Sequence, residues 1–177
     1  MRIVTNRLVL RRWNADDAPA LHALITDLRV AEWLGSADLT LADVPPWIET
    51  NELSFDERGY GRFAVVDRET GELVGRVGMA YAEQWHGTPE KEEIGWVIHP
   101  DRWGEGLATE AAAAVIADTF RRVGLERIVS FTMPTNIASR RVMEKLGFAF
   151  ERDIVHRGLP HLLYRRRAGA VAAGPAT

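Results

Sequence analysis

The chain has 177 residues, a formal net charge of −3 at neutral pH, 46 % hydrophobic residues and no cysteine. This length and composition exclude a largely disordered chain and predict one domain, which we place at residues 1–167. The lack of cysteine excludes disulfides, thiolate-ligated metals and cysteine nucleophiles, and the slightly acidic charge argues against nucleic-acid or anionic-membrane binding.

The distribution of apolar residues predicts a cytoplasmic protein. The longest uninterrupted apolar run, residues 111–117, is far shorter than the roughly 20 residues that span a bilayer. Four arginines lie between positions 2 and 12, and this segment lacks the apolar core of a signal peptide. Residues 168–177 are small and low in complexity, so we expect a disordered tail.

Hydrophobic spacing predicts the elements in chain order. From Asn14 a helix is expected to turn Leu21, Leu24, Ile25 and Leu28 to one face, whereas residues 30–60 are expected to be irregular around Gly35 and Pro45-Pro46. The remaining expected elements are strand 8–10, a helical stretch around 47–53, hairpin 63–67/73–80, loop 81–92, strand 94–99, a helix ending at Gly124, strand 129–133, a helix from Asn136 to Gly147, and hairpin 148–156/161–166. This order predicts an α/β fold, a mixed sheet with helices on both faces.

A strand, a glycine-rich turn and a long helix follow one another between residues 98 and 111. Helix N-termini leave backbone N–H groups unpaired and carry about half a positive charge, so they bind phosphates. Gly104 and Gly106 allow an anion to approach the backbone closely, although the same residues also suit a plain tight turn. The segment lacks Gly-Lys-Ser/Thr, and Thr109 replaces the third glycine of a dinucleotide fingerprint, so both of those motifs are excluded.

Four segments together resemble a known family. They are Thr5–Trp13 with Asp16–Ala18, Glu93–Ile98, Trp103–Glu110 and Asn136–Phe148. In this order they resemble the GNAT acyl-CoA N-acetyltransferases, particularly the ribosomal-protein N-terminal acetyltransferases (RimJ/RimL-like). The resemblance implies a mostly antiparallel GNAT-type sheet and the transfer of an acetyl group from acetyl-CoA to a primary amine.

The resemblance also implies where acetyl-CoA binds. The backbone of a splayed strand at 96–98 would pair with the pantetheine arm, and the N–H groups of 104–109 would hold the pyrophosphate. The implied cofactor-binding residues are Trp96, Val97, Ile98, Gly104, Glu105, Gly106, Leu107, Ala108, Thr109 and Asn136. Asn136 can also be a plain helix N-cap, and the two roles are compatible. Trp103 stands where the wider family often has Gln or Arg.

The catalytic assignments rest on one departure from the family. Members of the family frequently have a catalytic tyrosine in the helix that here begins at Asn136. That tyrosine aligns with Met143 of this chain, which cannot donate a proton. Ser139, one helical turn earlier, is the candidate that protonates the leaving thiolate, unless it is only small enough to pack there. Glu93 is the candidate base, acting through a water, unless it is a solvated member of an acidic run; Glu92 faces the other side of the strand.

The acceptor site is expected opposite acetyl-CoA, in residues 30–60 and 81–92. The candidate substrate-binding residues are Trp33, Tyr81 and Trp85, because aromatic side chains beside acids suit a cationic amine, although such aromatics are often core. His86, His156 and His161 lack metal-ligand spacing, so neither a metal site nor a histidine role is expected.

Three functions remain open from the sequence. The leading prediction is an acetyl-CoA-dependent N-acetyltransferase that acts in a ternary complex, as a monomer or homodimer, on a protein N-terminus or a small-molecule amine. A transferase of a larger acyl group is an alternative, with Trp96 or Met143 setting the pocket size. The second alternative is a non-catalytic module that binds or senses coenzyme A, because the catalytic tyrosine that is frequent in the family is missing.

Overall fold

The computed structural model describes residues 1–82 and 90–169, whose strands form one sheet. The sheet order is β1-β2-β3-β4-β5-β6-β8-β7, and every neighbouring pair is antiparallel except β5 and β6. The strands are β1 (Arg2–Val4), β2 (Leu8–Arg11), β3 (Arg62–Asp67), β4 (Leu73–Tyr81), β5 (Glu92–Ile98), β6 (Arg127–Thr132), β7 (Ala149–His156) and β8 (Leu159–Arg167). The mixed, mostly antiparallel sheet that the sequence predicts is therefore confirmed.

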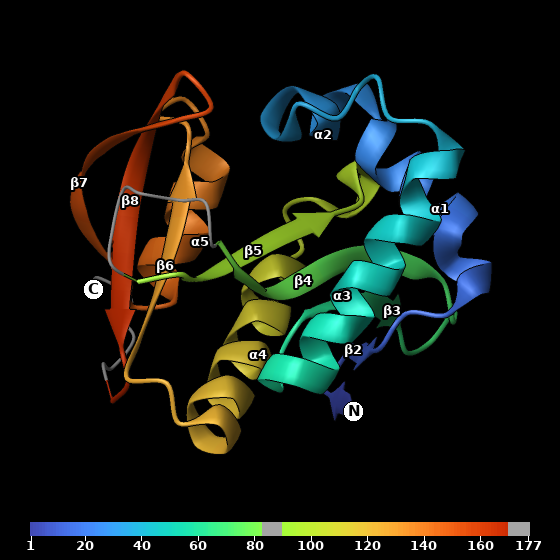
Figure 1. The fold of residues 1–177 in the computed structure, drawn as a ribbon, viewed down its shortest axis with the longest axis horizontal. Coiled ribbons are helices and arrows are strands. Elements are labelled where there is room, and N and C mark those ends of the chain that lie inside the picture. The colour runs from blue at the N-terminus through green and yellow to red at the C-terminus, as the bar shows by residue number, and fades with distance from the viewer. Residues whose placement is uncertain (83–89, 170–177) are drawn as a thin grey trace.

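Helices cover both faces of this sheet (Figure 1). They are α1 (Ala18–Thr26), α2 (Leu28–Leu34), α3 (Val44–Arg58), α4 (Leu107–Val123) and α5 (Ile137–Lys145). Leu107 of α4 and Met143 of α5 share the main core with Ile94 of β5. On the other face, α1 and α3 pack against Ala64 of β3. No helix in the described ranges has the length and apolar character to cross a membrane.

Two expectations for the first half of the chain are wrong. Residues 30–60 are mainly helical rather than irregular, because Pro45 and Pro46 lie in the first turn of α3, where a missing N–H breaks no helical hydrogen bond. Leu28 does not extend the apolar face of α1. That helix ends at Thr26, and Leu28 instead begins α2 with 77 % of its surface exposed.

Smaller differences concern the edges of the predicted elements. The short edge strand β1 was not expected, and Tyr81 ends β4 rather than starting a loop. The glycine stops are confirmed: Gly124 and Gly147 both have φ of +77°, at or just beyond the ends of α4 and α5. Trp85 and residues 170–177 lie outside the described residues.

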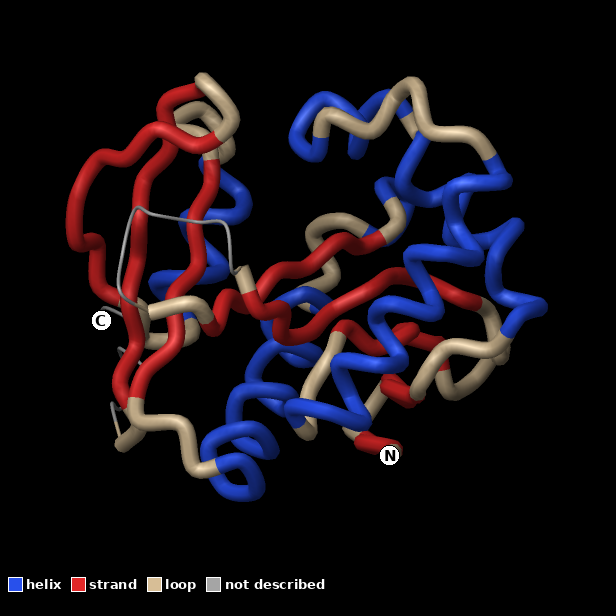
Figure 2. The backbone as a smooth tube through the Cα atoms, in the orientation of Figure 1, coloured by secondary structure: helices blue, strands red, loops and turns tan. Residues whose placement is uncertain are grey.

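The parallel strands β5 and β6 separate soon after they meet. Their pairing is registered at Glu93 and Val129, and the Ser130 hydroxyl donates to the Ile94 carbonyl at 2.8 Å. Beyond this point β5 continues beside β4 as far as Ile98, whereas β6 continues beside β8. Figure 2 shows the result: β6, β7 and β8 stand apart from the rest of the sheet. The edge of β5 that faces β6 is thus left without a strand partner from Gly95 onward.

Candidate active site

A cavity of about 710 Å³ lies where β5 and β6 separate. Its walls come from both strands, from α1, α2 and the start of α3, from the start of α5, and from the turn between β7 and β8. Of the residues predicted from the sequence, it brings together Trp33, Glu93, Trp96, Val97, Asn136 and Ser139. Residues more than 100 positions apart in the chain therefore face one space.

Other predicted site residues lie elsewhere. Ile98 is buried at the end of β5, and the turn at 104–109 lies beyond that end rather than in the cavity wall. Tyr81 is also outside the wall, with the Arg58 guanidinium 3.8 Å from its ring centroid. Trp85 falls in the part of the chain that the structure does not describe.

Glu93 is buried in the cavity floor and is not a solvated acid. Only 8 % of the residue is exposed, and its Oε2 accepts a hydrogen bond from Arg62 Nη2 at 2.9 Å. This ion pair offsets the cost of burying the carboxylate. The carboxylate is thus held in a fixed position in the cavity wall.

Asn136 positions the start of α5. Its Oδ1 accepts a hydrogen bond from the Ser139 backbone N–H at 3.0 Å, so it is the N-cap of this helix. Ser139 is partly exposed to the cavity. Met143, one turn later, is fully buried in the core. Of the two residues expected to set the acyl pocket size, only Trp96 therefore lines the cavity.

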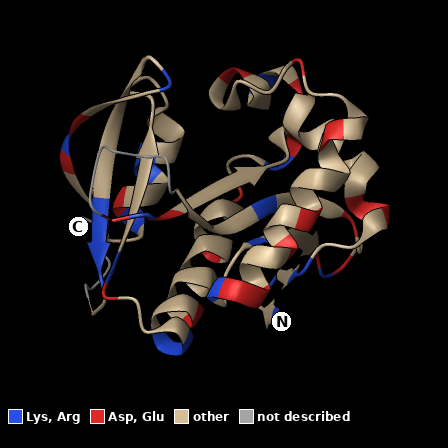
Figure 3. Ribbon diagram, in the orientation of Figure 1, with Lys and Arg blue, Asp and Glu red and all other residues tan. Residues whose placement is uncertain are grey.

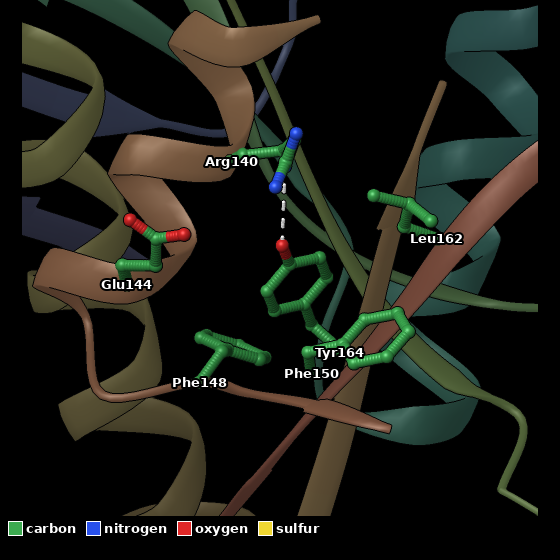
Figure 4. Close-up of a pocket in the computed structure, with 6 residues that line it drawn as sticks. All are labelled: Arg140, Glu144, Phe148, Phe150, Leu162 and Tyr164. Carbon is green, nitrogen blue, oxygen red and sulfur yellow. Dashed lines mark hydrogen bonds between the residues drawn. The ribbon is translucent and has the colours of Figure 1, made fainter. Parts of the chain in front are cut away.

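A smaller hollow of about 450 Å³ lies between α5 and the strands β7 and β8 (Figure 4). In its wall, Arg140 Nε donates to the Tyr164 hydroxyl at 3.3 Å, which links α5 to β8. Arg140 also donates from Nη1 to the Pro134 carbonyl at 3.3 Å. These contacts hold the helix that carries Ser139 against the sheet.

The glycine turn before α4 has the conformation that its residues predict. Gly104 and Gly106 have φ of +85° and +80°, which favour glycine. The Trp103 indole Nε1 donates to the Ile98 carbonyl at 2.7 Å, and Arg7 Nη1 donates to the Glu105 carbonyl at 2.9 Å. The turn is thus fixed to the end of β5 on one side and to the N-terminal segment on the other.

Charged side chains stabilise the same turn. Arg102 Nε donates to Glu105 Oε1 at 2.7 Å, and this contact lowers the pKa of Glu105. Burial raises the pKa of Glu110, but hydrogen bonds from Thr5 and Arg7 outweigh burial, so its pKa lies below the usual value. Both carboxylates are therefore negatively charged at neutral pH.

Several residues of the cavity wall have no role in the sequence interpretation, among them Arg62 and Arg76. His156 and His161, for which no role is expected from the sequence, also lie there. Arg76 interrupts the apolar strand β4, and that interruption is the signal that could have found it. Burial lowers the pKa of His156, with further lowering by Arg157 and His161. Among the described residues, no group of three or more potential ligands could hold a metal ion.

Comparison with known proteins identifies the family. Residues 7–149 match the acetyltransferase (GNAT) domain family. The chain belongs to the GNAT acetyltransferases. An uncharacterized N-acetyltransferase of Bacillus subtilis (strain 168), YoaA, is 31 % identical over 148 residues, which cover 83 % of this chain and 82 % of that protein. The enzyme class is therefore that of an acyltransferase.

Solved GNAT structures share the fold over almost the whole chain. The acetyltransferase from Agrobacterium tumefaciens str. C58 has a TM-score of 0.80 and 26 % identity, covering 94 % of each chain. RimL, a ribosomal L7/L12 alpha-N-protein acetyltransferase solved in complex with coenzyme A, has a TM-score of 0.78. At 22 % identity, over 97 % of this chain and 100 % of RimL, that likeness shows the fold.

Proposed function

We propose that this GNAT chain transfers an acetyl group from acetyl-CoA to a primary amine by direct attack in a ternary complex. The observation that carries the proposal is the cavity between β5 and β6, which Glu93, Asn136 and Ser139 face together. The acceptor is a protein N-terminal α-amine or a small-molecule amine. The protein acts as one domain of residues 1–167, in the cytoplasm, as a monomer or homodimer.

The residues around the glycine turn fit acetyl-CoA. The first turn of α4 has backbone N–H groups without helical partners, as every helix start does, and the left-handed glycines leave them accessible. The unpaired edge of β5 at 96–98 offers backbone groups to the pantetheine arm. Solved proteins of this fold bind coenzyme A, as RimL does, which supports the assignment.

The reaction needs a neutral amine and a protonated leaving group. An α-amine with a pKa near 8 loses its proton far more readily than a lysine side chain near 10.4. Glu93 accepts that proton through a bridging water, while Arg62 holds the carboxylate in place. As the nitrogen bonds to the carbonyl carbon and the carbon–sulfur bond breaks, Ser139 supplies a proton to the thiolate and regains one from solvent.

Within the family we place the chain near the RimJ/RimL-like branch. The segment that carries this resemblance, Thr5–Trp13, includes Arg7, which contacts the glycine turn directly. Trp33 and Trp47 of the cavity wall offer aromatic faces to an amine or its attached groups. The resemblance to N-terminal acetyltransferases favours an α-amine as the acetylated group.

Calorimetric titration with acetyl-CoA tests the proposal first. We expect micromolar binding that Gly106→Trp abolishes, because the added side chain fills the space over the turn. Gly124→Trp is the matched control: Gly124 has a similar φ of +77° and open space around it, but lies at the other end of α4. A screen of amines by release of free thiol then tests turnover. No binding of acetyl-CoA, or equal binding by both variants, would refute the proposal.

A further inference from the structure

Arg76 places an unpaired positive charge in the wall of the cavity. It lies in the middle of β4, and Figure 3 shows the blue of Lys and Arg on the ribbon of that strand. Its Nε is shielded from solvent without a hydrogen-bond partner, and its guanidinium lies 5.2 Å from the centroid of the Trp47 ring. Within the described residues, Arg76 makes no ion pair. A guanidinium has five N–H donors, so the side chain is equipped to bind an anion.

The strand register places Arg76 on the same side of the sheet as Glu93. Arg76 pairs with Ala64 on one side and Val97 on the other, and both of those residues pack against helices α1 to α3. Val97 and Glu93 are four residues apart on β5, so their side chains share a face. Arg62 projects from the same face and binds Glu93.

The buried part of the cavity therefore carries excess positive charge. Glu93 is its buried carboxylate, and its Oε2 is hydrogen-bonded to Arg62 rather than to Arg76. Glu32 and Asp43 also line the cavity, but both are exposed, and Asp43 already accepts hydrogen bonds from Thr40. Two guanidinium groups thus face one buried carboxylate, and an anionic ligand would complete the balance.

Burial affects the charge of Arg76 without removing it. Burial lowers the pKa of Arg76 to about 9, the neighbouring Arg62 lowers it too, and Glu93 acts in the opposite direction. At neutral pH the guanidinium is still positively charged. An incoming anion would pair with a charged group that has little water around it, where such pairs are strong.

Two glycines lie on the cavity face of the sheet between Arg76 and Glu93. Gly78 of β4 pairs with Gly95 of β5, so neither of these two positions carries a side chain. A Cβ on Gly78 would lie 2.2 Å from the Gly61 carbonyl oxygen, and a Cβ on Gly95 would lie 3.0 Å from Glu93 Oε1. The two glycines therefore let the Gly61 backbone and the Glu93 carboxylate lie close to the strands, and Arg76 and Glu93 line the same cavity.

We propose that the acetyl acceptor carries a carboxylate that pairs with Arg76 while its amine faces Glu93. This rests on the proposed acetyltransferase function. The aromatic wall formed by Trp33 and Trp47 suits an apolar group on the same molecule. The recognised chemistry, an amine and a carboxylate joined by a short linker, occurs in a free amino acid and in a peptide that begins with an acidic residue.

Paired acceptors that differ only in the carboxylate test the proposal. With saturating acetyl-CoA, thiol release is measured for phenylalanine against phenylalanine amide, and for Asp-Ala amide against Asn-Ala amide. The first pair tests a free amino acid and the second a peptide N-terminus. Rates are compared per neutral amine over a pH series, because the amide lowers the amine pKa. We expect one carboxylate acceptor to be preferred by about 10- to 100-fold in kcat/KM.

Substitution of Arg76 must remove this preference. We expect Arg76→Gln to reduce kcat/KM for the carboxylate acceptor through KM and to leave the uncharged acceptor within about threefold. Arg76→Lys keeps the charge and retains part of the preference. Arg121→Gln is the control, because Arg121 is 81 % exposed on α4, away from the cavity. If Arg76→Gln does not fold, the proposal is tested by the preference of wild type for the carboxylate acceptor and by how much of that preference Arg76→Lys retains.

The outcomes separate this inference from the proposed function. Turnover with equal rates for both members of each pair would overturn the carboxylate proposal and leave the acetyltransferase intact. If no amine is acetylated, titration with N-acetylphenylalanine and its amide in the presence of coenzyme A measures the anion site directly. Tighter binding of the carboxylate that Arg76→Gln removes supports the proposal, and equal binding overturns it. Failure to bind acetyl-CoA refutes the proposed function instead.

Discussion

Arg7 and Glu110 lie 103 positions apart in the chain, yet Arg7 Nε donates to Glu110 Oε2 at 2.8 Å. The Arg7 backbone N–H also donates to Glu110 Oε1, at 2.9 Å. These contacts attach the N-terminal segment to the first turns of α4, where the glycine turn begins the helix. The geometry of the proposed pyrophosphate site therefore depends on the N-terminal segment between β1 and β2, the strands at one edge of the sheet.

We expect Glu110→Gln to lower the free energy of unfolding by about 1 kcal/mol at neutral pH. The pKa of Glu110 is lowered in the folded protein from its ordinary value of 4.5. Its charge therefore stabilises the fold above pH 4.5, and this stabilisation is lost as the pH falls through the folded-state pKa. Denaturant unfolding at several pH values should show the difference between the two proteins shrink below pH 4.5. A constant difference would contradict this account.

Glu93→Gln should reduce kcat/KM at neutral pH by about 100-fold, because the variant lacks the carboxylate that takes the amine proton in the proposed mechanism. The loss should become smaller at high pH, where more of the amine is already neutral. Glu92→Gln is the matched control, since Glu92 is the adjacent residue and its side chain faces the opposite side of β5. A pH–rate profile of each variant provides the measurement. Unchanged profiles for both variants would exclude Glu93 as the base.

The local parts of this site could be predicted from the sequence. Gly124, Gly147 and Asn136 act on the backbone within one helical turn, so the ends of α4 and the limits of α5 follow from residue type alone. Pro45 and Pro46 misled the prediction, because proline breaks a helix in its interior but is tolerated in the first turn. The sequence pattern does not say which of these two positions a proline occupies.

The long-range parts could not be predicted in the same way. Arg76 reaches the cavity because β4 lies between β3 and β5, and strand order is a property of the whole sheet. The separation of β5 and β6 was expected only from the family resemblance, since nothing in the residues of either strand specifies where their pairing ends. The ion pair between Arg62 and Glu93 likewise depends on the order and register of the strands that carry these residues.

Ser139→Ala should lower kcat by about 10- to 100-fold and leave the affinity for acetyl-CoA unchanged, because the variant removes only a proton donor. Ser139→Thr retains a hydroxyl at this position and should retain more activity. Steady-state kinetics with both variants, together with a titration of acetyl-CoA, make this comparison. Full activity of Ser139→Ala across the pH range would mean that the residue is only a small packing partner.

A pair of substitutions should separate the two proposed roles of Asn136, the helix N-cap and the contact with acetyl-CoA. Asn136→Ala removes the acceptor for the Ser139 N–H and should cost about 1 kcal/mol of stability. Asn136→Ser keeps a capping oxygen and should retain most of that stability. If the Asn136 amide also contacts the pantetheine arm, as the family resemblance implies, both variants should bind acetyl-CoA several times more weakly. If Asn136→Ser binds acetyl-CoA like wild type, Asn136 is a helix cap and nothing more.

Substitution of the two arginines of the cavity should change stability in opposite directions. Without ligand, Arg76→Met removes an unpaired, partly buried charge, so we expect an increase of about 1 kcal/mol in the free energy of unfolding. Arg62→Met instead leaves Glu93 buried without its ion-pair partner and should decrease stability by about 1–3 kcal/mol.

Thermal and denaturant unfolding of both variants measures these two effects. A carboxylate ligand that pairs with Arg76 binds only the folded protein, so added ligand should stabilise wild type and not Arg76→Met. A loss of stability in Arg76→Met without ligand would show that Arg76 supports the fold through its contact with Trp47 instead. In that case the positive charge in the cavity would be a structural feature rather than a recognition site.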